Sequence, residues 1–166
     1  MENRPDIQPD FTLIDKLMEW AAWLFMIALW LTVILRYDAL PQIIPTHFNA
    51  AGEVDDTGDK MVVFFLPIIA TLMFIVITVL SQYPRIFNFP VSITPENALR
   101  QYTNAVRMLR YLKMVIALIF FWITTVVMLK AAGNTSGFIG PWSLPLLIAL
   151  IILPMTYFLF KAIRQR

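Results

Sequence analysis

Four long runs of apolar residues, separated by polar segments, dominate the pattern along the chain. The runs cover residues 17–35, 61–80, 111–129 and 142–160. Each is close to the roughly 20 residues that a helix needs to cross about 30 Å of hydrocarbon. They lack the alternation of barrel strands, and backbone groups in lipid must be paired within a helix or a closed barrel. The pattern therefore predicts a single membrane domain over residues 1–166, an all-α, four-helix polytopic transmembrane bundle.

Few residues interrupt these runs. The charged ones are Glu19 and Lys113, each about one turn inside its run, and we expect both side chains to snorkel to the interface. Three prolines, Pro67, Pro145 and Pro154, also fall within the runs and are predicted to kink their helices.

The small residues indicate how the helices pack. All five glycines lie outside the runs, so no helix offers a glycine seam for close contact. Packing is therefore predicted to rely on alanines and on threonine hydroxyls. These are Ala21, Ala22, Ala28, Ala70, Ala117 and Ala149, with Thr32, Thr71, Thr78, Thr124, Thr125 and Thr156.

Composition supports the membrane class and excludes two others. Of the 166 residues, 59% are apolar and 14% charged, against roughly 45 to 50% and about 25% in soluble domains. A disordered chain would be less hydrophobic and more highly charged. A disulfide scaffold is excluded because the sequence has no cysteine.

The basic residues predict the orientation, because Lys and Arg tend to stay on the cytoplasmic side. Ten of the 13 lie before the first run, between the second and third runs with Lys113 at the edge, or after the fourth run. We therefore expect both termini to be cytoplasmic. The segment 36–60 is then external, and five carboxylates make it net negative.

The segment before the third run predicts a basic cytoplasmic helix over about residues 95–113. Thr94 offers an N-cap hydroxyl, Pro95 suits the first helical position, and Glu96 lies near the positive end of the helix dipole. The helix either continues unbroken into the third run or bends onto the membrane surface. Its basic residues act either as topology anchors alone or as a surface for a cytoplasmic regulator or lipid. They are Arg100, Arg107, Arg110 and Lys113.

The external segment carries the most specific pattern, LPQIIPTHFNAAGEVDDTGDK over residues 40–60. Its prolines favour extended backbone, and 49–52 and 55–58 have turn chemistry. His47 is the sole histidine and a candidate for proton or metal chemistry, but one histidine with several carboxylates fits no tight zinc spacing. Alternatively, His47 and Asn49 hydrogen-bond the loop's own backbone and fix its shape, or the loop binds a cationic partner through its acidic residues.

This pattern, just before a transmembrane run, resembles the bacterial membrane domain of unknown function at the N-terminus of SdpI-type immunity proteins. The residues that match the motif are Pro41, Pro45, His47, Phe48, Asn49, Gly52, Asp55, Gly58 and Lys60. The resemblance implies a four-helix fold, a place in the bacterial cytoplasmic membrane, and binding roles for these residues. Proteins of that type protect the producing cell from a secreted toxic peptide, and the namesake also holds a repressor at the membrane.

No enzyme motif accompanies these features. The sequence has no HExxH, GxSxG, P-loop or dinucleotide fingerprint, so we expect no catalytic residues, cofactor, metal or nucleic-acid partner. Two hypotheses follow. In the first, a non-enzymatic membrane protein senses a ligand, an extracellular peptide or headgroup, through loop 41–60 and serves immunity or signalling. In the second, the chain is a small transport or permeation protein.

Overall fold

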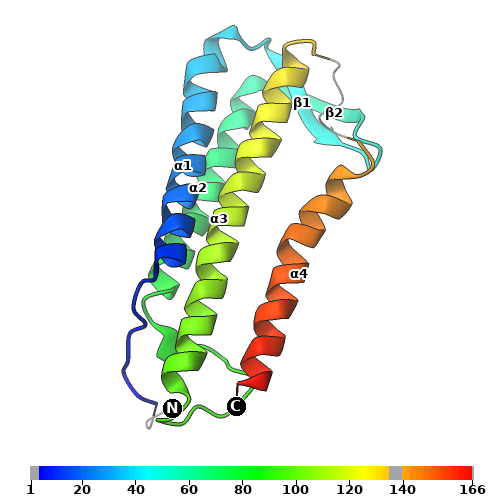
Figure 1. Cartoon of the computed structure of the whole chain (residues 1–166). Coiled ribbons are helices and arrows are strands. Elements are labelled where there is room, and N and C mark those ends of the chain that lie inside the picture. Colours follow the sequence, from blue (N-terminus) through cyan, green and yellow to red (C-terminus); the bar gives the residue numbers. More distant parts are fainter. Residues whose placement is uncertain (1–3, 135–139, 166) are drawn as a thin grey trace.

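The computed structural model describes residues 4–134 and 140–165. Within these ranges four helices run along one long axis, and a small two-stranded sheet covers one end of the bundle (Figure 1). The helices are α1 (Leu13–Arg36), α2 (Phe65–Leu80), α3 (Ala98–Ala131) and α4 (Ser143–Arg164). All four, α2 with the 3-10 turn at Lys60–Phe64 before it, are long and apolar enough to cross a membrane. The predicted four-helix fold is confirmed.

Helices α1, α2 and α3 form the closely packed part of the molecule. Their shared core contains Ala22 and Leu29 from α1, Ala70 and Phe74 from α2, and Ala117 from α3. The alanines and Leu29 are fully buried, so the helix backbones approach closely at this level. The prediction that alanine supports packing therefore holds for three of the named positions.

Two threonine hydroxyls of α2, those of Thr71 and Thr78, make contacts with neighbouring core helices. The Trp30 indole N–H on α1 donates to Thr71 Oγ1 on α2 at 3.0 Å. Several other threonines bond within their own helix, as Thr32 does to the Ala28 carbonyl. Threonine hydroxyls thus bond mainly to carbonyls of their own helix, and the close contacts between helix backbones are made at alanines.

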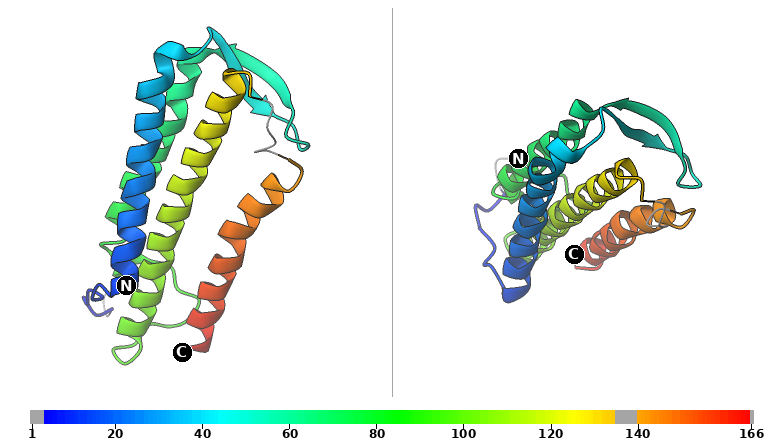
Figure 2. Two further views of the ribbon diagram at one scale, coloured as in Figure 1. Left: turned by 45° about the horizontal axis from the view of Figure 1, so that its top comes forward. Right: turned by 90° about the horizontal axis from the view of Figure 1, so that it is seen from above.

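Helix α4 lies beside α3, away from α1 and α2 (Figure 2). Three side chains of α3 donate to backbone carbonyls of α4. Gln101 Nε2 reaches the Ala162 carbonyl at 2.8 Å, Asn104 Nδ2 the Phe158 carbonyl at 2.8 Å, and the Tyr111 hydroxyl the Leu150 carbonyl at 3.0 Å. Helix α4 is therefore attached to α3 by polar contacts from Leu150 to Ala162.

The Leu150 contact explains how α4 tolerates a proline. Pro154 lies inside the helix and has no N–H to donate to the carbonyl four residues earlier, which belongs to Leu150. The Tyr111 hydroxyl supplies the missing hydrogen bond. Pro67 and Pro145 differ, because each is the third residue of its helix, where a proline removes no intrahelical bond. Of the three prolines, Pro154 alone therefore removes a hydrogen bond inside its helix, and the kinks themselves stay predictions.

Replacing Tyr111 with phenylalanine is expected to lower the free energy of unfolding by about 1 kcal/mol, because the Leu150 carbonyl loses its donor. Tyr157→Phe is the matched control, since Tyr157 is 61% exposed on α4. Unfolding in mixed detergent micelles, followed by circular dichroism, measures both variants. Equal stability of the two would show that the Tyr111 hydroxyl does not support α4.

Helix α3 is unbroken over 34 residues, about 50 Å. It begins at Ala98, later than the predicted start at Pro95, because the Asn97 side chain holds the preceding turn. Asn97 Oδ1 accepts from the Thr94 N–H at 2.9 Å, and its amide donates to the Ser92 carbonyl at 3.0 Å. A hydrogen bond with the Thr94 side chain also holds the pKa of the exposed Glu96 carboxyl below its ordinary value. Of the two alternatives, the continuous helix is correct.

Candidate functional site

The segment between α1 and α2 forms an antiparallel hairpin of β1 (Ile43–Phe48) and β2 (Val54–Asp59). Its turn is organised by Asn49, whose Oδ1 accepts from the Ala51 and Glu53 backbone N–H groups at 2.9 and 3.0 Å. Gly52 completes the turn with a φ of 83°, a conformation that glycine adopts without steric cost. The structure thus gives Asn49 the loop-fixing role that the sequence offered as one alternative.

His47 makes a side-chain contact across the hairpin. Its Nδ1 lies 2.5 Å from Asp55 Oδ1, and both side chains are exposed, at 68% and 42%. This differs from the expected bonding of His47 to the loop's own backbone. Across residues 4–134 and 140–165, no three His, Cys, Asp or Glu side chains come together as a metal site would require.

The base of the hairpin is tied to the helices by Lys60. Its backbone N–H donates to the Gln42 carbonyl at 2.9 Å, and its ammonium lies 4.7 Å from the centre of the Tyr37 ring. Gly58 lies close to the opposite strand, because a Cβ there would be 3.0 Å from Thr46 Cγ2. These motif residues therefore shape the hairpin and its attachment.

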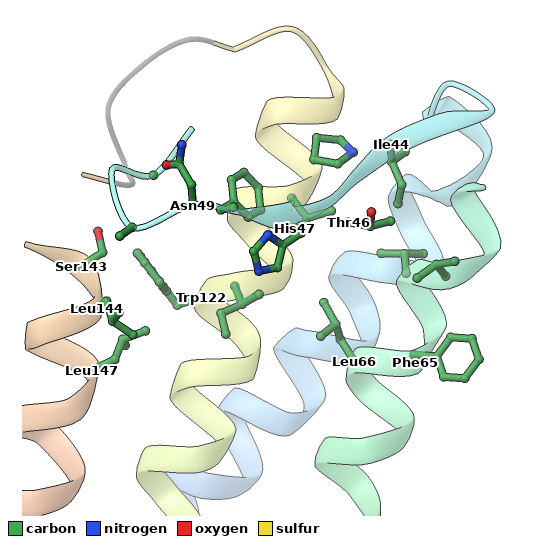
Figure 3. A pocket seen from close by; sticks show the side chains of 18 of the residues that line it. Ile44, Thr46, His47, Asn49, Phe65, Leu66, Trp122, Ser143, Leu144 and Leu147 are labelled. Carbon is green, nitrogen blue, oxygen red and sulfur yellow. The ribbon is translucent and has the colours of Figure 1, made fainter. Parts of the chain in front are cut away.

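Beneath the hairpin lies a cavity of about 520 Å³, bounded by β1 and by the upper parts of α2, α3 and α4. Figure 3 shows His47 pointing down from β1, with Trp122 of α3 between it and α4. Ser143, Leu144 and Leu147 line the α4 side and Leu66 the α2 side. We call this cavity the hairpin groove.

The predicted binding residues divide into two groups in the structure. Pro45, His47, Phe48, Asn49 and Gly52 line the hairpin groove. Pro41, Asp55, Gly58 and Lys60 do not line it. Sequence reasoning missed Trp122, Ser143 and Leu144, because an apolar run does not distinguish a groove-facing residue from one that faces lipid.

Four basic residues in the first half of α3, Arg100, Arg107, Arg110 and Lys113, lie at the end of the bundle opposite the hairpin, and the last three of them pair with carboxylates of α1. Arg107 donates from Nε and Nη2 to the two carboxylate oxygens of Asp15, at 2.9 and 3.0 Å. Lys113 Nζ lies 2.7 Å from Glu19 Oε2 and donates to Thr78 Oγ1 at 3.0 Å. Arg110 lies within 4 Å of both carboxylates. We call these five charged side chains the buried ion network.

This geometry corrects the expected exposure of these residues. Lys113 is 2% and Arg110 5% exposed, so neither presents its charge on an outer surface, and Arg100 alone of the four is exposed. Glu19 and Lys113 do not snorkel separately, because they pair with each other. A charge at this depth requires a counter-charge, which α1 supplies.

Four apolar helices, three of them packed around an alanine-lined core, define the chain as a multi-pass integral membrane protein. Residues 24–71, which include most of α1, the hairpin and the start of α2, match the family described as Domain of unknown function (DUF1648). The chain is also similar to an uncharacterized protein of Archaeoglobus fulgidus, 32% identical over 98 residues. The alignment covers 54% of this chain and 54% of that relative, so the chain spans about half its length. No solved structure matches this chain.

Proposed function

We propose that the protein is a non-enzymatic membrane receptor that binds a cationic, amphipathic extracellular peptide in the hairpin groove. The observation that carries the proposal is the groove itself, because it combines an apolar interior around Trp122 with polar groups at its rim. Ligand sites in proteins typically have this composition. The segment 36–60 above it carries five carboxylates against two cations, which favours a positively charged ligand.

The orientation belongs to the same proposal, with the hairpin outside the cell and both termini in the cytoplasm. Two observations support it. The described ends of the chain lie together at the end of the bundle opposite the hairpin (Figure 1). Nine of the 12 basic residues that the structure describes belong to that end. An external groove is accessible to a secreted peptide.

An immunity role in a bacterial cytoplasmic membrane follows from the resemblance of loop 40–60 to SdpI-type proteins. Binding a membrane-active peptide at the outer surface would keep that peptide from the bilayer, and this requires no catalytic group. Occupancy of the groove also has a physical route to the other side of the membrane. Its lining residue Trp122 lies on α3, the same unbroken helix that carries Arg107 and Arg110.

The binding test uses a 20-residue amphipathic peptide of Leu and Lys and, as control, the same peptide with Glu replacing Lys. The protein is held in nanodiscs of zwitterionic phosphatidylcholine, which limits attraction between peptide and lipid. We expect the Lys peptide to bind more tightly. Trp122→Ala is expected to weaken it by at least about 2 kcal/mol, roughly thirtyfold, as loss of a central aromatic anchor does. Asn49→Ala is also expected to weaken binding of the Lys peptide, because it removes the side chain that organises the hairpin turn.

The matched control is Trp20→Ala, because Trp20 is 64% exposed on α1 at the other end of the bundle. Equal affinity for the two peptides, or equal affinity of the Trp122 and Trp20 variants, would refute binding in the groove. Immunity has a separate readout. Expression of the wild type, but not of Trp122→Ala, should raise the concentration of Lys peptide that stops bacterial growth.

A further inference from the structure

The buried ion network contains three cations and two carboxylates, so it has one positive charge in excess. Each carboxylate already has a hydrogen-bonded cation, Arg107 for Asp15 and Lys113 for Glu19. Arg110 is the third cation. An uncompensated charge at membrane depth is costly, so an anion from outside the network is expected to balance it.

Arg110 retains unused capacity to donate hydrogen bonds. Its Nη1 lies 3.5 Å from Asp15 Oδ1 and its Nε 3.8 Å from Glu19 Oε1, and Nε has no hydrogen-bond partner. The guanidinium carbon lies 3.6 Å from the centre of the Phe11 ring, which fixes the plane of the group. A guanidinium offers five N–H donors, so Arg110 is held in place but not saturated.

A cavity of about 520 Å³ lies beside Arg110 and is distinct from the hairpin groove. It is bounded by α1 at Glu19, by α3 at Arg110 and by the end of α2 at Thr78. Gln8, Ser81 and Gln82 add polar groups to its wall. Because α2 ends at Leu80, the cavity lies at the level where a spanning helix leaves the hydrocarbon and meets the headgroups. We call it the Arg110 cavity.

We propose that the Arg110 cavity binds the phosphate group of an anionic phospholipid from the leaflet opposite the hairpin. A phosphodiester carries one negative charge, which equals the excess of the network. The planar guanidinium of Arg110 matches two phosphate oxygens. Glu19 also faces the cavity, but Lys113 neutralises it at 2.7 Å. Basic pockets between transmembrane helices commonly take lipid headgroups.

The test is native mass spectrometry of the detergent-solubilised protein with equal amounts of phosphatidylglycerol and phosphatidylcholine. We expect the wild type to retain phosphatidylglycerol about fivefold more than phosphatidylcholine, the factor typical of one cation at an anionic leaflet. Arg110→Gln should lose this preference. Arg100→Gln, which removes the same charge from an exposed position of the same helix, should keep it.

A second variant leaves every charge in place. Gln82→Trp fills the Arg110 cavity from an exposed position and should also abolish the preference, so the test remains decisive if Arg110→Gln does not fold. Millimolar inorganic phosphate added to the wild type distinguishes the two possible sources of the bound phosphate group, a phospholipid and free phosphate. Displacement of phosphatidylglycerol shows a site for phosphate from either source, and retention shows a lipid site. Equal retention of both lipids by the wild type would overturn the proposal, as would an unchanged preference in Gln82→Trp.

Discussion

Replacing Asp15 with alanine is expected to lower the free energy of unfolding by about 3–5 kcal/mol, the usual cost of removing one partner of a buried ion pair. Asp15 is 1% exposed and accepts two hydrogen bonds from Arg107, while Arg110 lies 3.5 Å away. Its removal leaves both guanidinium groups without their nearest counter-charge. The Asp15 carboxylate also accepts from the Thr12 backbone N–H at 3.0 Å, so the first turn of α1 loses its capping box.

Reversible unfolding in mixed detergent micelles, followed by circular dichroism, measures this effect. Asp10→Ala is the matched control, because it removes the same charge from an exposed position before α1. The double variant Asp15→Ala with Arg107→Ala should be more stable than the sum of the two single effects predicts, since both partners of one pair are then removed together. If Asp15→Ala is no less stable than Asp10→Ala, the network does not hold α1 against α3.

The sequence was sufficient to predict the four helices. A run of about 20 apolar residues has few alternatives once backbone pairing in lipid is required. The pairing of charges could not be predicted in the same way. Asp15 and Arg107 are 92 residues apart, and Glu19 and Lys113 are 94 apart. Within each run, a single charge near the end is equally consistent with snorkelling, so only the packing of α1 on α3 reveals the pairs.

The hairpin was predicted in part. The turn chemistry of residues 49–52 is local, and Asn49 and Gly52 fulfil it with contacts inside the loop. Strand pairing is less evident, because VDDTGD over 54–59 has only Val54 and Thr57 as strand formers. The groove could be predicted only on its hairpin side. Trp122 and Leu144 face it because α4 lies apart from α1 and α2, and that placement depends on the contacts of Gln101, Asn104 and Tyr111 with α4.

Replacing Ala117 with leucine is expected to lower the free energy of unfolding by about 1–3 kcal/mol, the usual cost of overpacking a tight core. Ala117 is fully buried in the cluster formed with Ala22, Leu29, Ala70 and Phe74. Three more carbon atoms there must displace α1 or α2 from α3. Displacement also strains the buried ion network, because its carboxylates lie on α1 and its cations on α3.

The matched control for this overpacking is Ala149→Leu on α4, a partly exposed position where a larger side chain can extend into lipid. Between helices in lipid there is little hydrophobic driving force, so close packing and polar contacts must supply the stability. We therefore expect the Ala117 variant to unfold at lower denaturant and the Ala149 variant to match the wild type, both measured in mixed micelles. Equal stability of the two variants would show that α1, α2 and α3 are not held together by close contact at this alanine cluster.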